Sequence, residues 1–252
     1  MSPAHAFDLI AASYDGLWTD SPVGRVQREA FWRHAGPYVK DAKNVLDIGC
    51  GTGEDAARLT RAGVRVTAID VSPQMVAMAR KRAVDARVLP IEQLHALNFF
   101  FEDASFHAAI SNFGALNCVE RLESIREPLA RLVAPGGYAV LCALGRFCLW
   151  ETAWFLLSGD LRKARRRWGG EALTSAGTRV FYHSVREFRR SLAPEFRLVK
   201  HAGIGICTPP SYVRCLSDRV LHRAARADQT LETARLFRAW ADHRLLIFRR
   251  VA

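Results

Sequence analysis

Three glycines and two acidic residues in the first third of the sequence are spaced for ligand binding. Asp47 precedes Gly49, Gly51 and Gly53 in the run V-L-D-I-G-C-G-T-G, and Asp70 closes the next apolar run. Glycine is favoured where the backbone takes positive φ or a ligand touches the main chain, and the following helix presents unpaired N–H groups. A carboxylate at the end of the next strand can accept both hydroxyls of a ribose. The predicted chemistry is the binding of a polar or anionic ligand that contains a ribose.

The spacing of the glycines distinguishes this turn from the dinucleotide fingerprint. That fingerprint is G-x-G-x-x-G with an acidic residue roughly 20 positions later, whereas this sequence has G-x-G-x-G with an acid before it. D-I-G-C-G-T-G followed by V-T-A-I-D resembles the class I S-adenosylmethionine (SAM)-dependent methyltransferases. The resemblance implies SAM as cofactor and S-adenosyl-L-homocysteine as its product, with the ribose at Asp70. A purely structural turn and a nicotinamide site are the alternatives.

The same resemblance implies further cofactor contacts. The run A-A-S-Y-D resembles the family's N-terminal cap, which implies that Tyr14, together with Arg28, contacts the SAM carboxylate. Plain packing of Tyr14 and solvation of Arg28 are the alternatives. The family contacts the adenine near residues 90–92, although Leu-Pro-Ile replaces the usual Gly-Asp-Ala there. The implied cofactor-binding residues are Tyr14, Arg28, Asp47, Gly49, Cys50, Gly51, Gly53, Asp70, Val71, Met75, Ile91, Glu92, Asn112 and Phe113.

Hydrophobic periodicity places these residues on alternating strands and helices. Predicted strands cover residues 44–48, 64–69, 86–89, 107–112, 138–143, 196–206 and 244–248, and predicted helices cover 25–38, 54–62, 72–84, 120–132, 147–161, 184–192 and 212–240. Asn112 and Phe113 follow the fourth strand, at the edge where open α/β sheets bind ligands. The expected fold is α/β and Rossmann-like: a doubly wound, mostly parallel seven-stranded sheet with the last strand antiparallel, plus a helical lid or insertions.

The length fits one domain. We expect a single methyltransferase domain over residues 1–252, with a helical cap at 1–40, a SAM-binding core at 41–144 and substrate-selecting insertions with the last strands at 145–252. The six cysteines form no C-x-x-C pair, so we expect reduced thiols and no metal site. No signal-peptide pattern and no run of about 18 apolar residues is present. The expected location is cytoplasmic.

The positive charge is concentrated in the second half of the sequence. The net charge is +11; residues 1–144 carry 15 basic and 16 acidic residues, whereas 145–252 carry 21 and 9. Such asymmetry indicates an acidic partner, an acidic substrate, a membrane surface or a solubilising surface. Residues 147–161 place large apolar side chains on one helical face, and five basic residues follow within 162–167. We predict a lid over a substrate pocket; peripheral contact with an anionic surface and plain packing are the alternatives.

The function implied by the resemblance is SAM-dependent methyl transfer to a small hydrophobic or anionic metabolite or lipid. A protonated acceptor requires a general base, for which His183 is the first candidate and Tyr212 the second; a structural role is the alternative for each. RNA methylation, suggested by the basic half, is disfavoured because no stacking-aromatic motif of a known RNA-binding module is present. A SAM-binding protein without catalysis is the alternative from another functional class.

Overall fold

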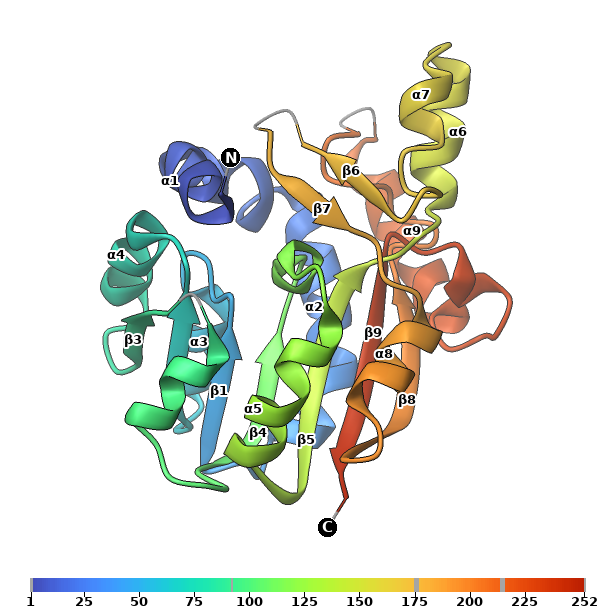
Figure 1. The fold of residues 1–252 in the computed structure, drawn as a ribbon. Helices are drawn as coiled ribbons and strands as arrows, with labels where there is room; N and C mark the ends of the chain where they lie inside the picture. The colour runs from blue at the N-terminus through green and yellow to red at the C-terminus, as the bar shows by residue number, and fades with distance from the viewer. Residues whose placement is uncertain (1, 92, 175–176, 214–215, 252) are drawn as a thin grey trace.

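One seven-stranded sheet forms the centre of the protein, in the order β3-β2-β1-β4-β5-β9-β8 (Figure 1). The computed structural model describes residues 2–91, 93–174, 177–213 and 216–251. Strands β1 to β5 are parallel, and β9 is antiparallel to both β5 and β8, which confirms the predicted fold class. The strands are β1 (Asn44–Ile48), β2 (Arg65–Asp70), β3 (Arg87–Pro90), β4 (Phe106–Ser111), β5 (Val133–Leu144), β8 (Phe196–Ile204) and β9 (His243–Arg250).

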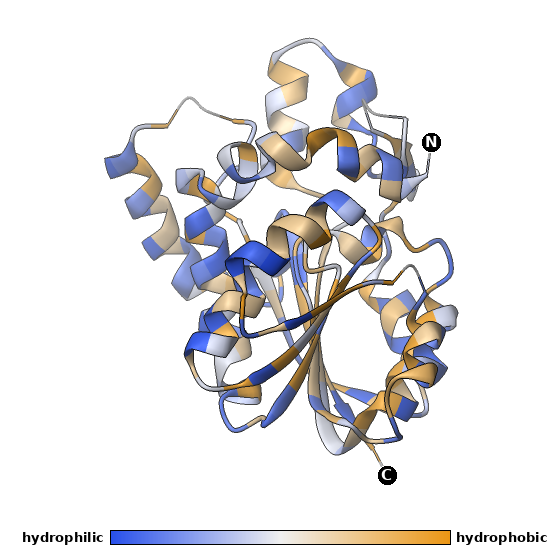
Figure 2. Cartoon of the chain, turned by 90° about the vertical axis from the view of Figure 1, so that its left-hand side faces the viewer, coloured by the Kyte–Doolittle hydropathy of each residue, from blue (hydrophilic) through white to orange (hydrophobic). Residues whose placement is uncertain are grey.

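Helices cover both faces of this sheet because successive strand residues point to opposite faces. Val45 belongs to a buried cluster with Phe31, whereas its neighbour Leu46 belongs to a second cluster with Leu129. The hydrophobic residues accordingly follow the strands and the inner sides of the helices in Figure 2. One face carries α2 (Pro22–Val39), α3 (Glu54–Arg61) and α4 (Pro73–Arg82), and the other carries η2 (Leu94–Phe99), η4 (Leu122–Ile125), α5 (Arg126–Leu132) and α8 (Val185–Leu192).

A second group of elements lies above the edge where the parallel strands end (Figure 1). It includes the N-terminal helix, a projecting helical pair and a two-stranded hairpin. These elements are α1 (Pro3–Tyr14), the π-helical turn η1 (Asp15–Thr19), η3 (Ala115–Cys118), α6 (Leu149–Leu157), α7 (Leu161–Ala164), β6 (Glu171–Leu173) and β7 (Arg179–Phe181). The remaining helices are α9 (Asp218–Leu231) and η5 (Phe237–Ala239). The edge is therefore covered by the N-terminal segment and by segments from residues 115–181.

Several predicted helix boundaries were wrong. Helix α2 continues through Pro37 to Val39, and the predicted helix at 120–132 divides into η4 and α5. Pro128 is the third residue of α5, where the N–H that proline lacks is not needed within the helix. The predicted helix at 212–240 is replaced by the shorter α9 and by η5. Hydrophobic periodicity does not show where a helix ends, because the ends are set by local polar contacts that the periodic pattern does not contain.

The apolar run at 147–161 is also not one helix. Helix α6 ends at Leu157, Gly159 takes φ +76°, and the Asp160 side chain accepts a hydrogen bond from the Lys163 N–H to begin α7. The predicted single apolar face is therefore split across a turn. Within the described residues, no helix is long and apolar enough to cross a membrane.

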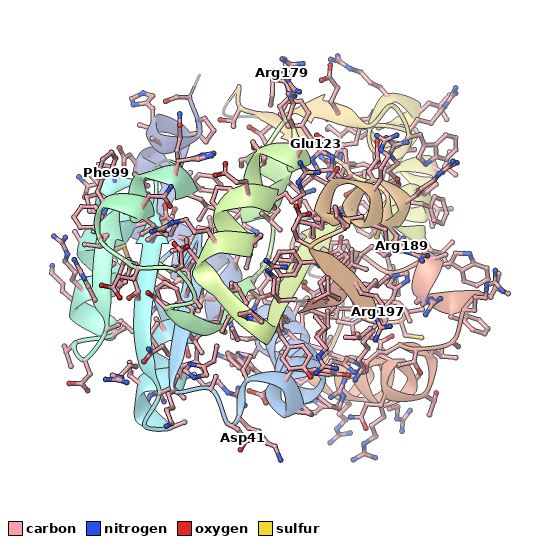
Figure 3. The ribbon with its side chains drawn as sticks, turned by 60° about the horizontal axis from the view of Figure 1, so that its bottom comes forward. Asp41, Phe99, Glu123, Arg179, Arg189 and Arg197 are labelled. Carbon is pink, nitrogen blue, oxygen red and sulfur yellow. The ribbon has the colours of Figure 1, made fainter. Side chains whose placement is uncertain are left out.

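Much of the basic excess lies on the outer surface. Arg189 on α8 and Arg197 on β8 are exposed, and both point away from the sheet in Figure 3. These positions fit a solubilising role, because exposed charges keep most of their hydration.

Candidate functional site

The glycine turn joins β1 to α3 and needs glycine for two reasons. Gly49, Gly51 and Gly53 all have positive φ, at 70°, 55° and 83°. A β-carbon on Gly49 would lie 2.2 Å from Cβ of Ala115, and one on Gly53 would lie 2.9 Å from Cα of Ala79. Two of the glycines are thus required by close packing as well as by backbone conformation.

Gly51 differs because its surroundings are open. The nearest atom to an added β-carbon would be Cε1 of Tyr14 at 3.9 Å. The Gly51 N–H donates to Oδ2 of Asp70 at 2.9 Å, and the Ser72 N–H donates to Oδ1 at 2.9 Å. Burial raises the pKa of Asp70, while these two backbone N–H groups act in the opposite direction. The turn and the acidic residue that ends β2 therefore form one unit.

A cavity of about 480 Å³ lies beside this unit, and we call it the cofactor cavity. It is also lined by Phe7, Leu94 and His95, which sequence reasoning missed because they belong to no motif. The predicted cofactor residues that line it are Tyr14, Gly49, Gly51, Asp70, Val71, Met75, Ile91, Asn112 and Phe113. Residues from five separate segments therefore meet around one cavity.

The other predicted cofactor residues lie elsewhere. Cys50 and Gly53 belong to the turn but do not line the cavity, and Glu92 lies outside the described residues. Asp47 is buried, and its Oδ2 has no hydrogen-bond partner among the described residues. Burial, with Asp55 nearby, raises the pKa of Asp47 well above its usual value. The Asp47 side chain is therefore a buried carboxyl group with unused hydrogen-bonding capacity.

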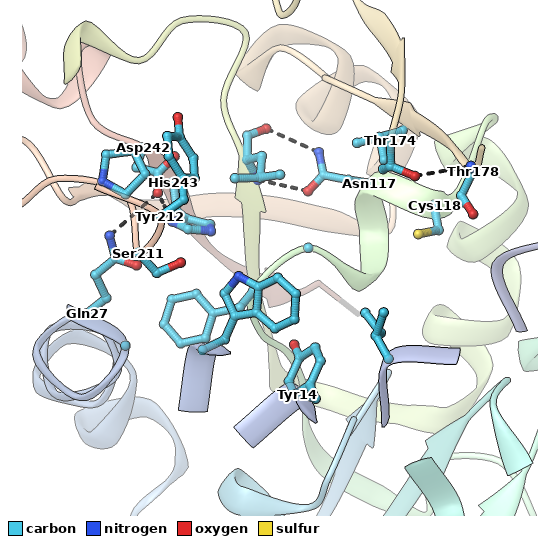
Figure 4. A pocket seen from close by; sticks show the side chains of 18 of the residues that line it. Tyr14, Gln27, Asn117, Cys118, Thr174, Thr178, Ser211, Tyr212, Asp242 and His243 are labelled. Atoms are coloured by element: carbon cyan, nitrogen blue, oxygen red, sulfur yellow. Dashed lines mark hydrogen bonds and ion pairs between the residues drawn. The ribbon is translucent and has the colours of Figure 1, made fainter. Parts of the chain in front are cut away.

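A second cavity, of about 380 Å³, adjoins the first and is called the acceptor cavity (Figure 4). Four residues line both cavities: Phe7, Tyr14, Phe113 and Cys118. The rest of the wall includes Trp18, Arg28, Asn117, Leu144, Arg166, Arg167, Thr174, Val180, Tyr182, Tyr212, Asp242 and His243. The shared residues mark the place where two bound molecules would meet.

Helix α1 roofs both cavities but is lightly anchored. Its only buried residues are Ala6 and Ala11. At α4, the Asp8 side chain accepts hydrogen bonds from the Ser72 hydroxyl at 2.5 Å and from the Gln74 N–H at 3.1 Å. Polar contacts that water can replace therefore provide part of the hold on this helix.

The comparisons with known proteins agree on one family. A family model described as a methyltransferase domain matches residues 46–141. A methyltransferase of Mycobacterium tuberculosis, named as uncharacterized, is 31% identical over 156 residues, which are 60% of this chain and 77% of that protein. The chain belongs to the SAM-dependent methyltransferase family.

Other methyltransferases match over part of their length or by fold. The demethylmenaquinone methyltransferase of Clavibacter sepedonicus is 33% identical over 138 residues, 54% of this chain and 55% of that protein. The chain spans about half the length of the first curated relatives that it matches. A SAM-dependent methyltransferase of Mesorhizobium loti has the same fold, with a TM-score of 0.59, 18% identity, and 89% and 98% of the two chains covered.

The cofactor cavity fits SAM, the cofactor of this methyltransferase family. SAM presents ribose hydroxyls, an ammonium group and a sulfonium, all of which favour acceptor oxygens. The cavity offers the Asp70 carboxylate and, at Asn112, a buried Oδ1 without a hydrogen-bond partner among the described residues. Gly51 leaves the main chain open to approach. The donor and acceptor chemistry of the cavity therefore suits the methyltransferase cofactor.

Arg28 already has a carboxylate partner in this methyltransferase. Its guanidinium pairs with Asp55 and lies 5.2 Å from the ring centroid of Phe113. The same carboxylate accepts hydrogen bonds from Trp32 at 2.7 Å and from Asn112 at 2.9 Å. Arg28 lines the acceptor cavity and not the cofactor cavity, so its predicted contact with the SAM carboxylate stays a prediction.

The basic cluster after α6 is partly buried. Glu151, with a side chain 1% exposed, accepts two hydrogen bonds from Arg166 and two from Arg167, at 2.7–2.9 Å. Arg167 also pairs with Asp242 at 2.7 Å. These arginines hold the pKa of Glu151 at about 2 although burial opposes this. We call Glu151, Arg166, Arg167 and Asp242 the buried ion network; it forms one wall of the acceptor cavity.

The two predicted general bases have different positions. Tyr212 lines the acceptor cavity, but its hydroxyl donates to Glu151 at 2.7 Å, and burial beside that carboxylate raises its pKa further. His183 lines neither cavity: its Nε2 lies 2.8 Å from the carbonyl oxygen of Val119 and its ring lies near Phe181. The expectation that His183 lies at the pocket is therefore corrected, and Tyr212 is held as a phenol.

Proposed function

We propose that this protein transfers the methyl group of SAM to a small, largely apolar acceptor. The observation that carries the proposal is the pair of adjoining cavities with the shared residues Phe7, Tyr14, Phe113 and Cys118. Methyl transfer is an in-line displacement, so holding two molecules end to end supplies much of the rate, on the order of 7–11 kcal/mol. The wall of the acceptor cavity is rich in aromatic side chains, which favours a flat, ring-containing acceptor.

The residues of the chain have separate parts in this proposal. Asp70 and the glycine turn would hold the ribose and the methionine part of SAM, which supplies an activated methyl group on sulfur. Tyr14 and Phe113 would exclude water from the shared region. The name of the Clavibacter sepedonicus relative, a demethylmenaquinone methyltransferase, supports an apolar ring-containing acceptor. We extend the proposal to a cytoplasmic site of action.

The proposed function is tested first by cofactor binding and then by methyl transfer to an acceptor. Isothermal titration calorimetry is expected to show binding of SAM and S-adenosyl-L-homocysteine. Incubation with SAM that carries a tritiated methyl group, followed by extraction of lipids, small metabolites and RNA, is expected to place the label in the organic extract. Label in RNA would favour the rival function, and SAM binding without any transfer would favour a non-catalytic protein.

A contact with an anionic membrane surface is proposed for the α6–α7 tip, defined as Leu156, Leu157, Leu161, Arg162 and Arg165. All five side chains are exposed, and Leu157 is 88% exposed. The tip projects beside the hairpin β6–β7, which borders the acceptor cavity (Figure 1). Apolar side chains flanked by cations suit an interface of anionic lipid, and each cation adds about 1 kcal/mol there.

Liposome sedimentation tests the tip. The protein is expected to sediment with phosphatidylglycerol vesicles and not with phosphatidylcholine vesicles. Replacing Leu156, Leu157 and Leu161 by Ser is expected to abolish sedimentation. The control replaces Val84, which is 73% exposed and outside the tip, by Ser. Equal sedimentation of both variants, or none by the parent protein, would overturn the proposed surface contact.

A further inference from the structure

His243 is a buried histidine in the acceptor cavity to which the sequence assigned no role. It is the first residue of β9 and lies between the ends of β5 and β8 in the sheet. Its residue surface is 7% exposed, yet the ring lines the acceptor cavity, where Figure 4 shows it beside Tyr212 and Asp242. It therefore lies at the carboxyl end of β5, and open α/β sheets bind ligands at the carboxyl ends of their strands.

One ring nitrogen of His243 lies near the carboxylate of the residue before it. Nδ1 is buried, has no hydrogen-bond partner among the described residues, and lies 3.4 Å from Oδ2 of Asp242. Oδ1 of the same carboxylate is held by Arg167 at 2.7 Å. Since Nδ1 faces Asp242, Nε2 is the ring nitrogen left for a group bound in the acceptor cavity that His243 lines. The buried ion network thus fixes a carboxylate behind the histidine.

The position of the ring relative to the cofactor cavity is favourable. The His243 ring centroid is 5.1 Å from that of Phe113, with an edge-to-face angle of 77°. Phe113 lines both cavities. A group bound against His243 would therefore be separated only by the Phe113 ring from the shared region where the methyl group would be delivered.

The other titratable groups of the acceptor cavity are poorly suited to accept a proton. Burial raises the pKa of Tyr14 to about 12 and that of Cys118 to about 11. The Tyr212 hydroxyl donates a hydrogen bond to Glu151, and the carboxylate of Asp242 is paired with Arg167. Among the described lining residues, His243 is the group that combines a basic nitrogen with an access to the cavity.

Burial favours the neutral form of His243 near pH 7. Burial lowers its pKa, and Arg167 and Arg244 act in the same direction, while Asp242 opposes them. Arg167 comes from the segment after α7, Arg244 is the next residue of β9, and Asp242 is the preceding one; Phe113 contributes an apolar edge. A neutral imidazole can accept a proton, whereas a protonated one cannot.

We propose that His243 is the general base of the methyl transfer and that the acceptor reacts through a weakly acidic hydroxyl on a ring. This inference rests on the proposed function. The acceptor oxygen forms a bond to the methyl carbon, the carbon–sulfur bond breaks with its electron pair remaining on sulfur, and the hydroxyl proton passes to Nε2 of His243. The positive charge carried by sulfur before transfer is then carried by the imidazolium, so atoms and charge balance.

A phenol-type hydroxyl fits this site better than an aliphatic one. The aromatic wall, which includes Tyr14, Trp18 and Tyr182, can pack on a flat ring. A phenol also has a pKa near 10, which is much closer to the pKa of an imidazole than that of an aliphatic alcohol is. Proton transfer from a phenol to a neutral imidazole is therefore less unfavourable.

The test uses 2-naphthol as the probe, with wild-type protein and His243→Asn. In the presence of tritiated SAM, wild type is expected to label 2-naphthol, with a rate that rises through a pKa below 6.5 and is flat near neutral pH. His243→Asn is expected to lower kcat by about 10²–10⁴-fold while SAM affinity stays within about twofold. The rate of the variant is expected to increase with pH as naphtholate forms. His222→Asn, on exposed α9, serves as the matched control.

A second measurement does not depend on turnover or on the variant. In wild-type protein bound to S-adenosyl-L-homocysteine, addition of 2-naphthol is expected to shift the Nε2 resonance of His243 in a ¹⁵N spectrum. Binding of 2-naphthol without that shift, absence of 2-naphthol binding, or unchanged kcat in His243→Asn would each overturn the assignment. Failure of the proposed function would give a different result, namely no binding of SAM in calorimetry. That result would overturn both the proposed function and the assignment of His243.

Discussion

Replacing Glu151 by Gln is expected to destabilise the protein by about 3 kcal/mol. The carboxylate is 1% exposed and accepts four N–H groups from Arg166 and Arg167 and the hydroxyl of Tyr212. Its pKa falls from 4.5 to about 2, and about 1.36 kcal/mol per pH unit converts this into roughly 3 kcal/mol. Removing one partner of a buried ion pair typically costs about 3–5 kcal/mol, because the remaining charge stays buried.

The pH dependence of this loss has a defined sign. A carboxylate whose pKa is lower in the folded state stabilises the protein above its unfolded pKa. The difference between wild type and Glu151→Gln is therefore expected to be constant above about pH 5. It is expected to shrink as the pH falls from 4.5 toward 2, since wild type then loses the contribution of the charge.

Urea denaturation at pH 7 and at pH 4 measures this difference. With a slope of about 2–3 kcal/mol per molar urea, the midpoint of Glu151→Gln is expected to be about 1 M lower at pH 7. Glu29→Gln is the control, because Glu29 pairs with Arg58 but its side chain is 64% exposed, and such pairs contribute about 0–1 kcal/mol. A midpoint change for Glu151→Gln no larger than that of the control would refute the reasoning.

Three further predictions concern the turn, the cofactor and acid stability. Gly51→Ala is expected to remain folded but to lose SAM binding in calorimetry. Gly49→Ala, whose added β-carbon would lie 2.2 Å from Cβ of Ala115, is expected to lower the thermal midpoint as well. Asp70→Asn is expected to weaken SAM binding about 10–100-fold, with exposed Asp85→Asn unchanged. Burial lowers the pKa of His201 to about 4, so folding stability is expected to fall by about 1–2 kcal/mol between pH 7 and pH 5, after allowance for solvent screening. His201→Asn is expected to remove that fall in urea midpoints.

The parts of the fold that could be predicted are those specified by neighbours in sequence. Strand β1, the glycine turn and α3 lie within 18 residues, and their conformations follow from residue type at each position. The same is true of α8, where Ser184 and Glu187 form a capping box. The cofactor cavity was predictable in part: Gly49 and Gly51 belong to the first of these local units, and Asp70 and Asn112 stand at or just after the ends of predicted strands.

The acceptor cavity could not be predicted because its key contacts join distant residues. Arg167 and Asp242 are 75 positions apart, and a run of arginines gives no sign that one of them becomes buried. Periodicity identified residues 244–248 as a strand, but it could not show that His243 opens onto a cavity. His183 was selected by its position before a helix, and that feature does not determine which way a side chain points.

The single roof over both cavities makes the two bound molecules thermodynamically dependent on each other. Phe7 and Tyr14 on α1 touch both spaces, and the helix is tied down by polar contacts such as those of Asp8. We expect the ligand that binds first to bear the entropic cost of holding this helix closed, so that the second binds more tightly. By thermodynamic linkage the effect is mutual. The factor by which SAM increases the affinity for the acceptor equals the factor by which the acceptor increases the affinity for SAM. After the proposed transfer, loss of either product is expected to weaken the binding of the other.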